Sequence, residues 1–289
     1  MAGVQRADRR KAAARWHPTR QRGRFTRMDS PLDAGRTDPA GTLAAQLAAA
    51  PLPYLEGALD NPALHPELLL IVLKNRAVTG SLIQRIARRA SWLKPYEVKA
   101  AIVLHPKTPR GLAMNLLQFL WWRDLARVAD DSVLAPPLRR AAERILSLRL
   151  QELALGEKIA LARIASRGVI NVLRKQEHPM LIRALLQNPR LLEEDALAIA
   201  SASGTPPGVL QTLAEDGRFS TRPVVQKALV QNHGTPAATA LRILPGLGAQ
   251  TLKELARAPH VPTLVKVAAQ RILEAREHPR GDPSSGPAS

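Results

Sequence analysis

The sequence contains no cysteine. Disulfides, thiolate nucleophiles, zinc–thiolate sites and cysteine-ligated iron–sulfur clusters are therefore excluded. Aromatic residues make up only 3% of the 289 residues, and no run approaches the roughly 18 uncharged apolar residues that a membrane span needs. We expect a cytosolic protein that has no membrane contact and binds no metal or cofactor.

Acidic residues are few relative to basic ones, 24 Asp and Glu against 42 Lys and Arg, which gives a formal charge of +18. This excess favours acidic partners without identifying one. Residues 1–27 carry nine of the bases and one acid, without apolar periodicity. We predict that residues 1–39 form a disordered arm and linker, whose basic part can contact phosphates. A start codon assigned too far upstream of Met28, or a targeting sequence, would produce a similar leader.

An internal repeat is the most informative feature of the chain. Residues 61–146 align without a gap to residues 188–273, at an offset of 127, with 22 identities in 86 pairs. The segment between the two copies keeps the same apolar spacing. We therefore predict a continuous helical-repeat solenoid over residues 40–275, followed by a disordered tail at 276–289.

Short helices are indicated within each copy by apolar residues at i, i+3, i+4 and i+7, and strand-like alternation is absent. Asn-Pro, His-Pro and Thr-Pro pairs recur, and we interpret them as helix starts. Proline is tolerated at the first helical position, and a preceding Thr or Asn would cap the free amides of the helix that follows. The predicted fold class is all-α: a right-handed α-α superhelix of short two-helix repeats, internally duplicated.

The repeat unit of about 26 to 30 residues, with the motifs N-P-x-L, H-P-K-T-P-R-G-L and N-H-G-T-P-A-A-T-A-L, resembles the leucine-rich repeat variant family and its HEAT-like relatives. The resemblance covers about residues 61–273. The stretch Y-E-V-K-A-A-I-V-L-H-P-K-T-P is also similar to uncharacterised bacterial proteins, which implies no activity. Some variant-family members carry an iron–sulfur cluster on an N-terminal cysteine motif, and that property does not transfer to a chain without cysteine.

The sequence offers no catalytic constellation, and we expect a protein that is not an enzyme. Five of the seven histidines precede proline. His105 aligns with Asn232, which suits a role in a turn and not that of a general base. The acidic run Glu193–Asp195 is interpreted as a solvated helix end. Trp122-Arg123-Asp124 resembles a pattern of HEAT-like alkylpurine DNA glycosylases, but no longer motif matches and no catalytic residue is assigned.

Aromatic and basic residues gather in the first copy. Five of the nine aromatics, Trp92 and Tyr96 among them, lie between residues 92 and 122. The second copy has Gly246, Gly248 and Ala249 opposite Phe119, Trp121 and Trp122. We expect one of the paired tryptophans to be buried and the other partly exposed. The candidate binding residues are Lys94, Tyr96, Lys99, Lys107, Arg110, Trp121, Trp122, Arg123, Arg139 and Arg140.

Helical solenoids provide extended concave surfaces, so the favoured hypothesis is a non-enzymatic scaffold that binds a protein partner through its concave surface. The alternative is a nucleic-acid-binding protein that uses the bases and aromatic rings of the first copy, or, as a third hypothesis, a DNA glycosylase. The same bases are also typical of an ordinary solvated surface.

Overall fold

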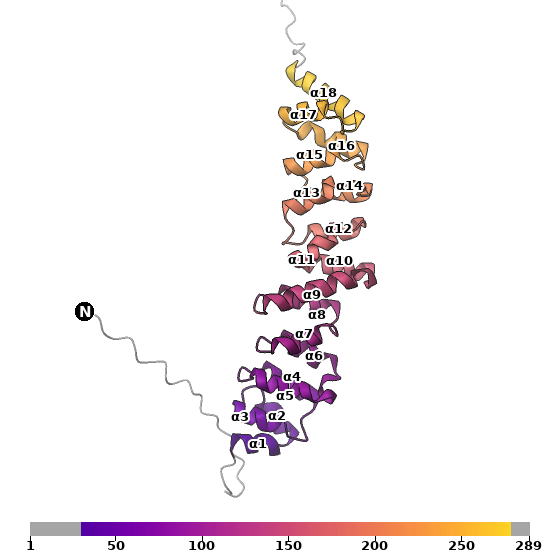
Figure 1. The fold of residues 1–289 in the computed structure, drawn as a ribbon. Coiled ribbons are helices and arrows are strands. Elements are labelled where there is room, and N and C mark those ends of the chain that lie inside the picture. Colours follow the sequence, from indigo (N-terminus) through magenta and orange to yellow (C-terminus); the bar gives the residue numbers. More distant parts are fainter. Residues whose placement is uncertain (1–29, 279–289) are drawn as a thin grey trace, which may run out of the picture. The chain divides into compact units, whose positions relative to one another are not determined.

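The computed structural model describes residues 30–278, and within this range the regular structure is helical, with no strand (Figure 1). The predicted all-α class is confirmed. The chain divides into two compact units. Unit 1 runs to Asp124 and includes Ser132–Leu138, whereas unit 2 comprises Leu125–Asp131 and the residues from Arg139 onward.

Unit 1 contains the first seven α-helices and one 3₁₀ turn: α1 (Pro31–Thr37), α2 (Ala40–Gln46), α3 (Leu52–Ala58), α4 (Pro66–Lys74), α5 (Gly80–Arg88), η1 (Ala90–Leu93), α6 (Tyr96–Leu104) and α7 (Arg110–Leu117). Two helices have their first residues in unit 1 and the rest in unit 2: α8 (Trp122–Asp130) and α9 (Pro136–Arg149). Unit 2 holds the remaining elements: η2 (Leu150–Glu152), α10 (Leu155–Ile164), α11 (Arg167–Leu173), α12 (Pro179–Leu186), α13 (Glu193–Ser201), α14 (Pro207–Glu215), α15 (Pro223–Gln231), α16 (Ala237–Ile243), η3 (Leu244–Gly246), α17 (Ala249–Arg257) and α18 (Thr263–Glu277).

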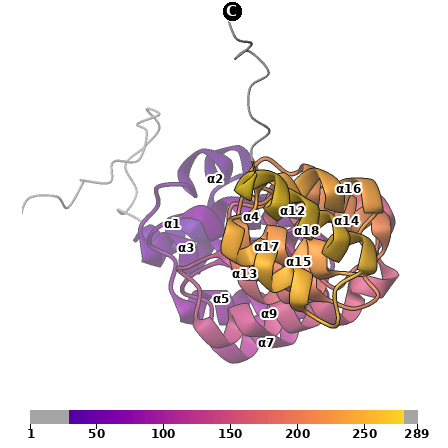
Figure 2. The same ribbon diagram turned by 90° about the horizontal axis from the view of Figure 1, so that it is seen from above.

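Many helices pack on the second helix along the chain, whereas α17 packs on its direct neighbour α18. In unit 2, α12 packs on α14 and α13 on α15, and in unit 1, α4 packs on α6. Figure 2 shows the result in unit 2: α13, α15 and α17 overlap on one side, and α14 and α16 overlap on the other. Each short helix buries the apolar residues of one face, such as Val209, Leu210 and Leu213 of α14. Two layers of helices thus enclose a continuous apolar core.

The two sequence copies have the same helix boundaries. Helices α13, α14, α15 and α17 begin and end 127 residues after α4, α5, α6 and α8. The core positions also correspond, because Val98 and Val225, like Leu125 and Leu252, are fully buried in both copies. The apolar pattern that both copies share is therefore the pattern of the core.

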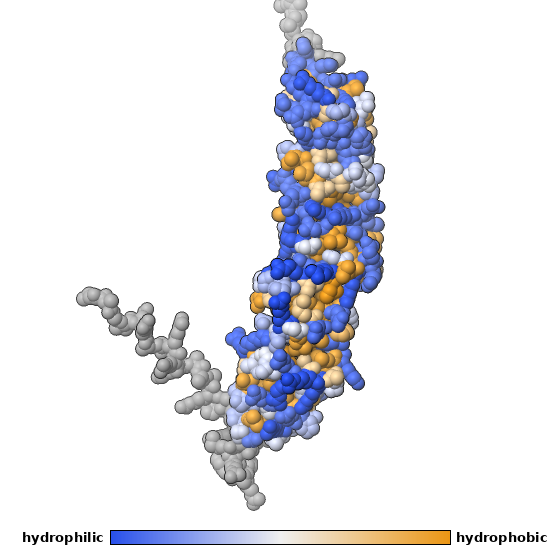
Figure 3. Space-filling view, viewed as in Figure 1, coloured by the Kyte–Doolittle hydropathy of each residue, from blue (hydrophilic) through white to orange (hydrophobic). Residues whose placement is uncertain are grey.

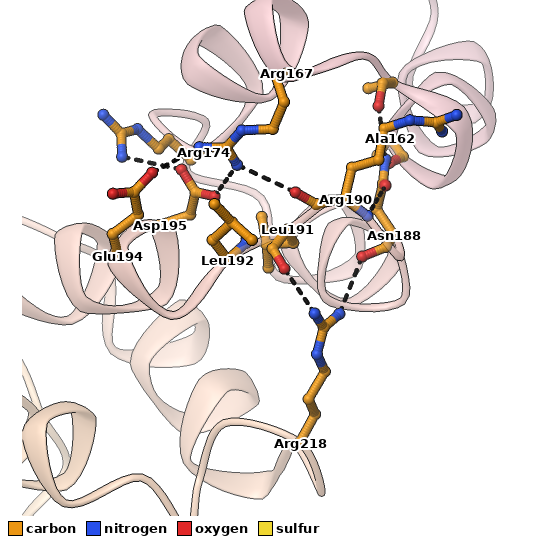
Figure 4. A network of polar contacts seen from close by, with 11 residues as sticks. Ala162, Arg167, Arg174, Asn188, Arg190, Leu191, Leu192, Glu194, Asp195 and Arg218 are labelled. Carbon is orange, nitrogen blue, oxygen red and sulfur yellow. Dashed lines mark hydrogen bonds and ion pairs between the residues drawn. The ribbon is translucent and has the colours of Figure 1, made fainter. Parts of the chain in front are cut away.

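Buried asparagines join successive repeats. The Asn188 side chain lies in a loop after α12 and is 0% exposed. Its amide donates to the carbonyls of Ala162 (2.8 Å) and Ala165 (3.1 Å), at the end of α10 (Figure 4). Its Oδ1 accepts the Arg190 N–H at 2.9 Å. The carbonyls of a last helical turn have no intrahelical partner, so this one side chain satisfies groups in two loops at once.

Three other asparagines make the same set of contacts. Asn61 bonds the carbonyls of Gly35 and Asp38, and Asn75 bonds those of Leu47 and Ala50. Asn232 bonds the carbonyls of Ala200 and Ala202. In each case Oδ1 accepts the N–H two residues further on, at 2.7 to 2.9 Å. The Asn-Pro pairs were predicted to be helix starts, and this was wrong, because both lie in the loops before α4 and α13. They are instead one form of a loop contact that recurs in both units.

An acidic residue predicted to be solvated is instead buried. Asp195 is 0% exposed and forms ion pairs with Arg167 and Arg174, which lie at the two ends of α11 (Figure 4). The same carboxylate also accepts the Leu192 backbone N–H at 2.9 Å and so caps the start of its own helix, α13. The prediction of a solvated helix end was wrong for Asp195, since bases that neutralise this charge come from another helix and are not visible in the local sequence.

The Thr-Pro pairs mark helix starts, as predicted, but their hydroxyl groups act on the preceding helix. Thr108, Thr205 and Thr235 donate to the carbonyls six residues earlier, at 2.5, 3.0 and 2.6 Å. The prolines that follow them are N-cap residues without a side-chain cap. Thr79, which no proline follows, does cap its own helix by accepting the Leu82 N–H at 3.3 Å. The predicted capping role was therefore wrong for the three Thr-Pro pairs, and the threonine that does cap a helix has no proline after it.

The helical region begins earlier than predicted. Helix α1 starts at Pro31, within the range 1–39 that we expected to lack structure, and Ser30 caps it. It packs on α3 through two glycines: a Cβ on Gly35 would lie 2.2 Å from the Tyr54 carbonyl oxygen, and one on Gly57 would lie 1.9 Å from that of Leu32. A helix of seven residues leaves too little periodicity to be recognised. The other end differs by two residues, because α18 continues to Glu277. The expected arm at 1–27 and most of the expected tail lie outside the described residues.

A search of residues 30–278 for membrane-spanning segments finds no helix with the length and apolar character to cross a bilayer.

Replacing Asn188 by alanine is expected to lower the free energy of unfolding by about 3 kcal/mol, because two carbonyls and one N–H lose their partner in a buried loop. Urea unfolding followed by circular dichroism measures this. Asn171→Ala is the matched control, since Asn171 is an exposed residue of α11 and should change stability by less than about 0.5 kcal/mol. Equal effects of the two substitutions would contradict a structural role for the Asn188 amide.

Candidate aromatic and basic binding surface

Six residues of unit 1 form what we call the aromatic–basic surface: Tyr96, Lys99, Phe119, Trp121, Trp122 and Arg123. Tyr96 and Lys99 lie on α6, Phe119 and Trp121 lie in the turn between α7 and α8, and Trp122 and Arg123 begin α8. Five of them belong to the ten residues predicted from the sequence. Phe119 joins them because its ring lies under the Lys99 ammonium group.

The centre of this surface is a pair of stacked rings. The Tyr96 and Trp121 rings are 3.9 Å apart between centroids and within 12° of parallel. The Trp121 backbone N–H donates to the Tyr96 hydroxyl oxygen at 3.1 Å, and that hydroxyl donates to Asp124. Trp121 is nevertheless 64% exposed, and Phe119 is 53% exposed. Hydrogen bonds therefore fix the Tyr96 ring and the Trp121 backbone, and the indole that stacks on this ring remains open to solvent.

Basic side chains accompany the other two rings. The Lys99 Nζ lies 5.5 Å from the centre of the Phe119 ring, and the Arg123 guanidinium lies 5.3 Å from the Trp122 ring. These are cation–π distances, and at exposed sites each such contact contributes about 0.5–1 kcal/mol. Lys94, two residues before Tyr96, is exposed. Of the paired tryptophans we expected one to be buried and the other partly exposed; the first part was wrong, because Trp122 is half-buried and Trp121 is exposed.

The other predicted bases lie elsewhere. The Lys107 ammonium donates to the carbonyls of Arg76 (2.7 Å) and Val78 (2.8 Å), which makes it a loop contact. Arg110 begins α7, whose eight residues separate it by roughly 12 Å from the turn that carries Phe119 and Trp121. Arg139 and Arg140 belong to unit 2, and the Arg139 Nε is buried without a hydrogen-bond partner.

His105 has the turn role that its alignment with Asn232 predicted. Its Nδ1 accepts the Lys107 N–H at 3.1 Å, as the Asn232 Oδ1 accepts the Gly234 N–H at 2.9 Å. In the first copy the Lys107 ammonium then reaches the preceding loop, as the Asn232 amide does in the second. Burial, and secondly the Lys107 charge, lower the pKa of His105 below its ordinary value. His105 and Lys107 together thus replace one asparagine.

Trp92 belongs to the fold and not to the surface. It is buried, and the Arg89 guanidinium lies 4.3 Å from its ring while donating to the Leu59 carbonyl at 2.7 Å. Its counterpart Phe219 is also buried, with Arg218 4.7 Å from its ring. An aromatic ring covered by an arginine is therefore a shared element of both copies.

The aromatic–basic surface, by contrast, is present in one copy only. The counterparts of its residues are Pro223, Gln226, Gly246, Gly248, Ala249 and Gln250. Leu120 and Leu247, inside the same turn, are nevertheless buried in both copies. The second copy makes the equivalent turn without these rings and bases. The fold therefore does not need them.

Exposed apolar side chains also occur elsewhere. Figure 3 shows several apolar patches separated by polar side chains over the face in view. Among the large apolar side chains exposed in residues 30–278, however, Phe119 and Trp121 are the only aromatic ones. The same part of the chain holds no group of three His, Asp or Glu side chains placed to bind a metal ion.

Two contributions were missed at the sequence level. Phe119 stood in the aromatic run but was not among the predicted site residues, although its alignment with Gly246 was a usable signal. The role of Asp124 in holding the Tyr96 hydroxyl had no local signal, because the two residues are 28 positions apart.

Comparison of the chain with models of known protein families, with curated proteins and with solved structures finds no significant match.

The lowered pKa of His105 predicts an acid-sensitive turn. In the unfolded chain this imidazole takes up a proton as the pH falls through about 6.5, whereas the folded turn requires an unprotonated Nδ1. The free energy of unfolding should therefore fall as the pH drops from about 6.5 toward the lower pKa of the folded state. Urea unfolding at pH 7.5 and pH 5.5 measures the loss. His105→Asn, which installs the residue of the second copy, should reduce it, and an unchanged loss would contradict the role assigned to His105.

Proposed function

We propose that this protein is a non-enzymatic helical-repeat scaffold that binds a protein partner, and that the aromatic–basic surface is part of the binding surface. The observation that carries the proposal is the contrast between the copies. The exposed Trp121 and Phe119 are replaced by glycine in the second copy, whereas the buried positions of the same turn are kept. Exposed aromatic rings that packing does not require are best explained by something they contact.

The chemistry of the surface supports a macromolecular partner. Tryptophan, tyrosine and arginine are the residues that most often dominate binding energy at protein interfaces. Hydrogen bonds order the Tyr96 ring and the Trp121 backbone, and the Trp121 indole stacks on that ring, so less side-chain entropy is lost when a partner binds than for rings without such contacts. Rings flanked by Lys99 and Arg123 also suit single-stranded nucleic acid, which is the competing outcome of the experiment below.

The test compares the full chain with the double variant Phe119→Ala/Trp121→Ala. Each protein is used to recover partners from cells that express it, after nuclease treatment, and the recovered proteins are quantified by mass spectrometry. We expect a protein that the unchanged chain retains and the double variant loses, with affinity lowered about 30-fold or more, as removal of an interface hot spot predicts.

Met180→Ala/Val224→Ala is the matched control, because both side chains are large, apolar and exposed in unit 2. It should recover the same partner as the unchanged chain. Recovery that disappears on nuclease treatment would support nucleic acid instead, and equal recovery by both double variants would contradict a role for the aromatic–basic surface.

A further inference from the structure

The charge around the stacked rings is net positive. Residues 94–124 contain five bases and two acids, and three of the bases (Lys94, Lys99 and Arg123) remain once Lys107 and Arg110, which lie elsewhere, are set aside. One of the acids, Asp124, accepts the hydrogen bond of the Tyr96 hydroxyl, so its charge lies at the hydroxyl end of the Tyr96 ring. Glu97 is the remaining acid, and it is exposed. A ligand that approaches the rings therefore meets apolar faces with cations beside them.

Two of the cations lie beside rings of the surface, and the third is close to Tyr96 in the sequence. Lys99 lies over Phe119, Arg123 lies over Trp122, and Lys94 precedes Tyr96 by two residues. The next bases along the chain do not extend this group, because Lys107 is bound to carbonyls and Arg110 lies at the other end of α7. A nucleic-acid strand is held by bases that follow its backbone over several phosphates. The compact group of cations fits a short ligand that combines apolar and acidic groups.

The ring pair offers one open face to such a ligand. Tyr96 covers one side of the Trp121 indole at stacking distance, and the indole is still 64% exposed. Two exposed rings, Phe119 and Trp121, are separated by the single residue Leu120, which is buried and fixes the turn between them. An aromatic or large aliphatic side chain can therefore pack against the indole, while neighbouring carboxylates reach the flanking cations.

We propose that the aromatic–basic surface binds an acidic peptide segment of the partner, which places one aromatic or large aliphatic side chain on Trp121 and Phe119 and its carboxylates on Lys94, Lys99 and Arg123. This inference rests on the proposed function, since it specifies the chemistry of the partner. Charge complementarity selects the acidic segment, and the open indole face selects its apolar anchor.

The experiment uses the full chain and four labelled probes of equal length, with binding followed by fluorescence anisotropy. The first probe is a peptide of about twelve residues, rich in glutamate, with a central Phe-Leu pair. The second replaces that pair by Ala-Ala, the third replaces each glutamate by lysine, and the fourth is an oligothymidylate. The first probe is expected to bind at least about tenfold more tightly than each of the other three, with an affinity that decreases as salt is added.

Two sets of variants locate the site. Phe119→Ala/Trp121→Ala should weaken binding of the first probe about tenfold or more. Lys99→Gln/Arg123→Gln introduces the residues of the second copy, which leaves the turn intact, and should weaken binding and reduce its salt dependence. Lys253→Gln/Arg242→Gln removes two exposed bases of unit 2 and should change neither. Circular dichroism verifies that each variant keeps its helix content.

Three outcomes would overturn the inference: no binding of the acidic probe, equal binding by the two surface variants and the unchanged chain, or tighter binding of the oligothymidylate. These results are distinct from a failure of the proposed function. A partner protein recovered in a Trp121-dependent manner, together with failure of the acidic probe, would leave the scaffold function standing and reject the acidic segment. If no protein is recovered by the unchanged chain that the Phe119→Ala/Trp121→Ala variant fails to recover, the proposed function itself is rejected.

Discussion

The two units depend on the satisfaction of loop carbonyls between neighbouring repeats. A helix of seven to nine residues has more unpaired terminal groups than internal hydrogen bonds, so an array of such helices has an unusual number of carbonyls to satisfy. Four asparagines, buried at positions 61, 75 and 188 and half-buried at position 232, each bond two carbonyls of an earlier loop and one N–H of their own. Arg218 and Arg276 add further bonds of this kind. Short helices can stack closely because these side chains do what water would do at an isolated helix end.

The sequence was sufficient for the fold class, and its Thr-Pro pairs marked helix starts, because both depend on local patterns, whereas the Asn-Pro pairs lie in loops. Apolar spacing and proline pairs act within one helix, and the alignment of the copies extended the inference to helices with the same boundaries. What could not be predicted depends on contacts between distant residues. The Thr108 hydroxyl bonds backward to Ile102 and not forward, and Asp195 is buried by arginines of another helix. Helix α1 is held by the close approach of Gly35 and Gly57 to the neighbouring backbone, which no periodicity reveals.

The aromatic part of the candidate site could be predicted because the two copies differ in sequence there. Aligning the copies separates residues that the core requires from residues that it does not, and this comparison identified Trp121 and Trp122. The comparison could not distinguish basic residues of the surface from basic residues that bond loop carbonyls, because both kinds look alike in a sequence. Lys107 and Lys99 are eight positions apart, yet one bonds the loop at Arg76 and Val78 and the other lies over the Phe119 ring.

The sequence order of each asparagine and its acceptor carbonyls determines when their contact can form during synthesis. Each of the four asparagines follows its acceptor carbonyls by 23 to 32 residues. During synthesis a ribosome therefore releases the acceptor loop first and the side chain that closes it later. Each of these four contacts can therefore form only once its asparagine has also left the exit tunnel, after the loop that supplies the carbonyls.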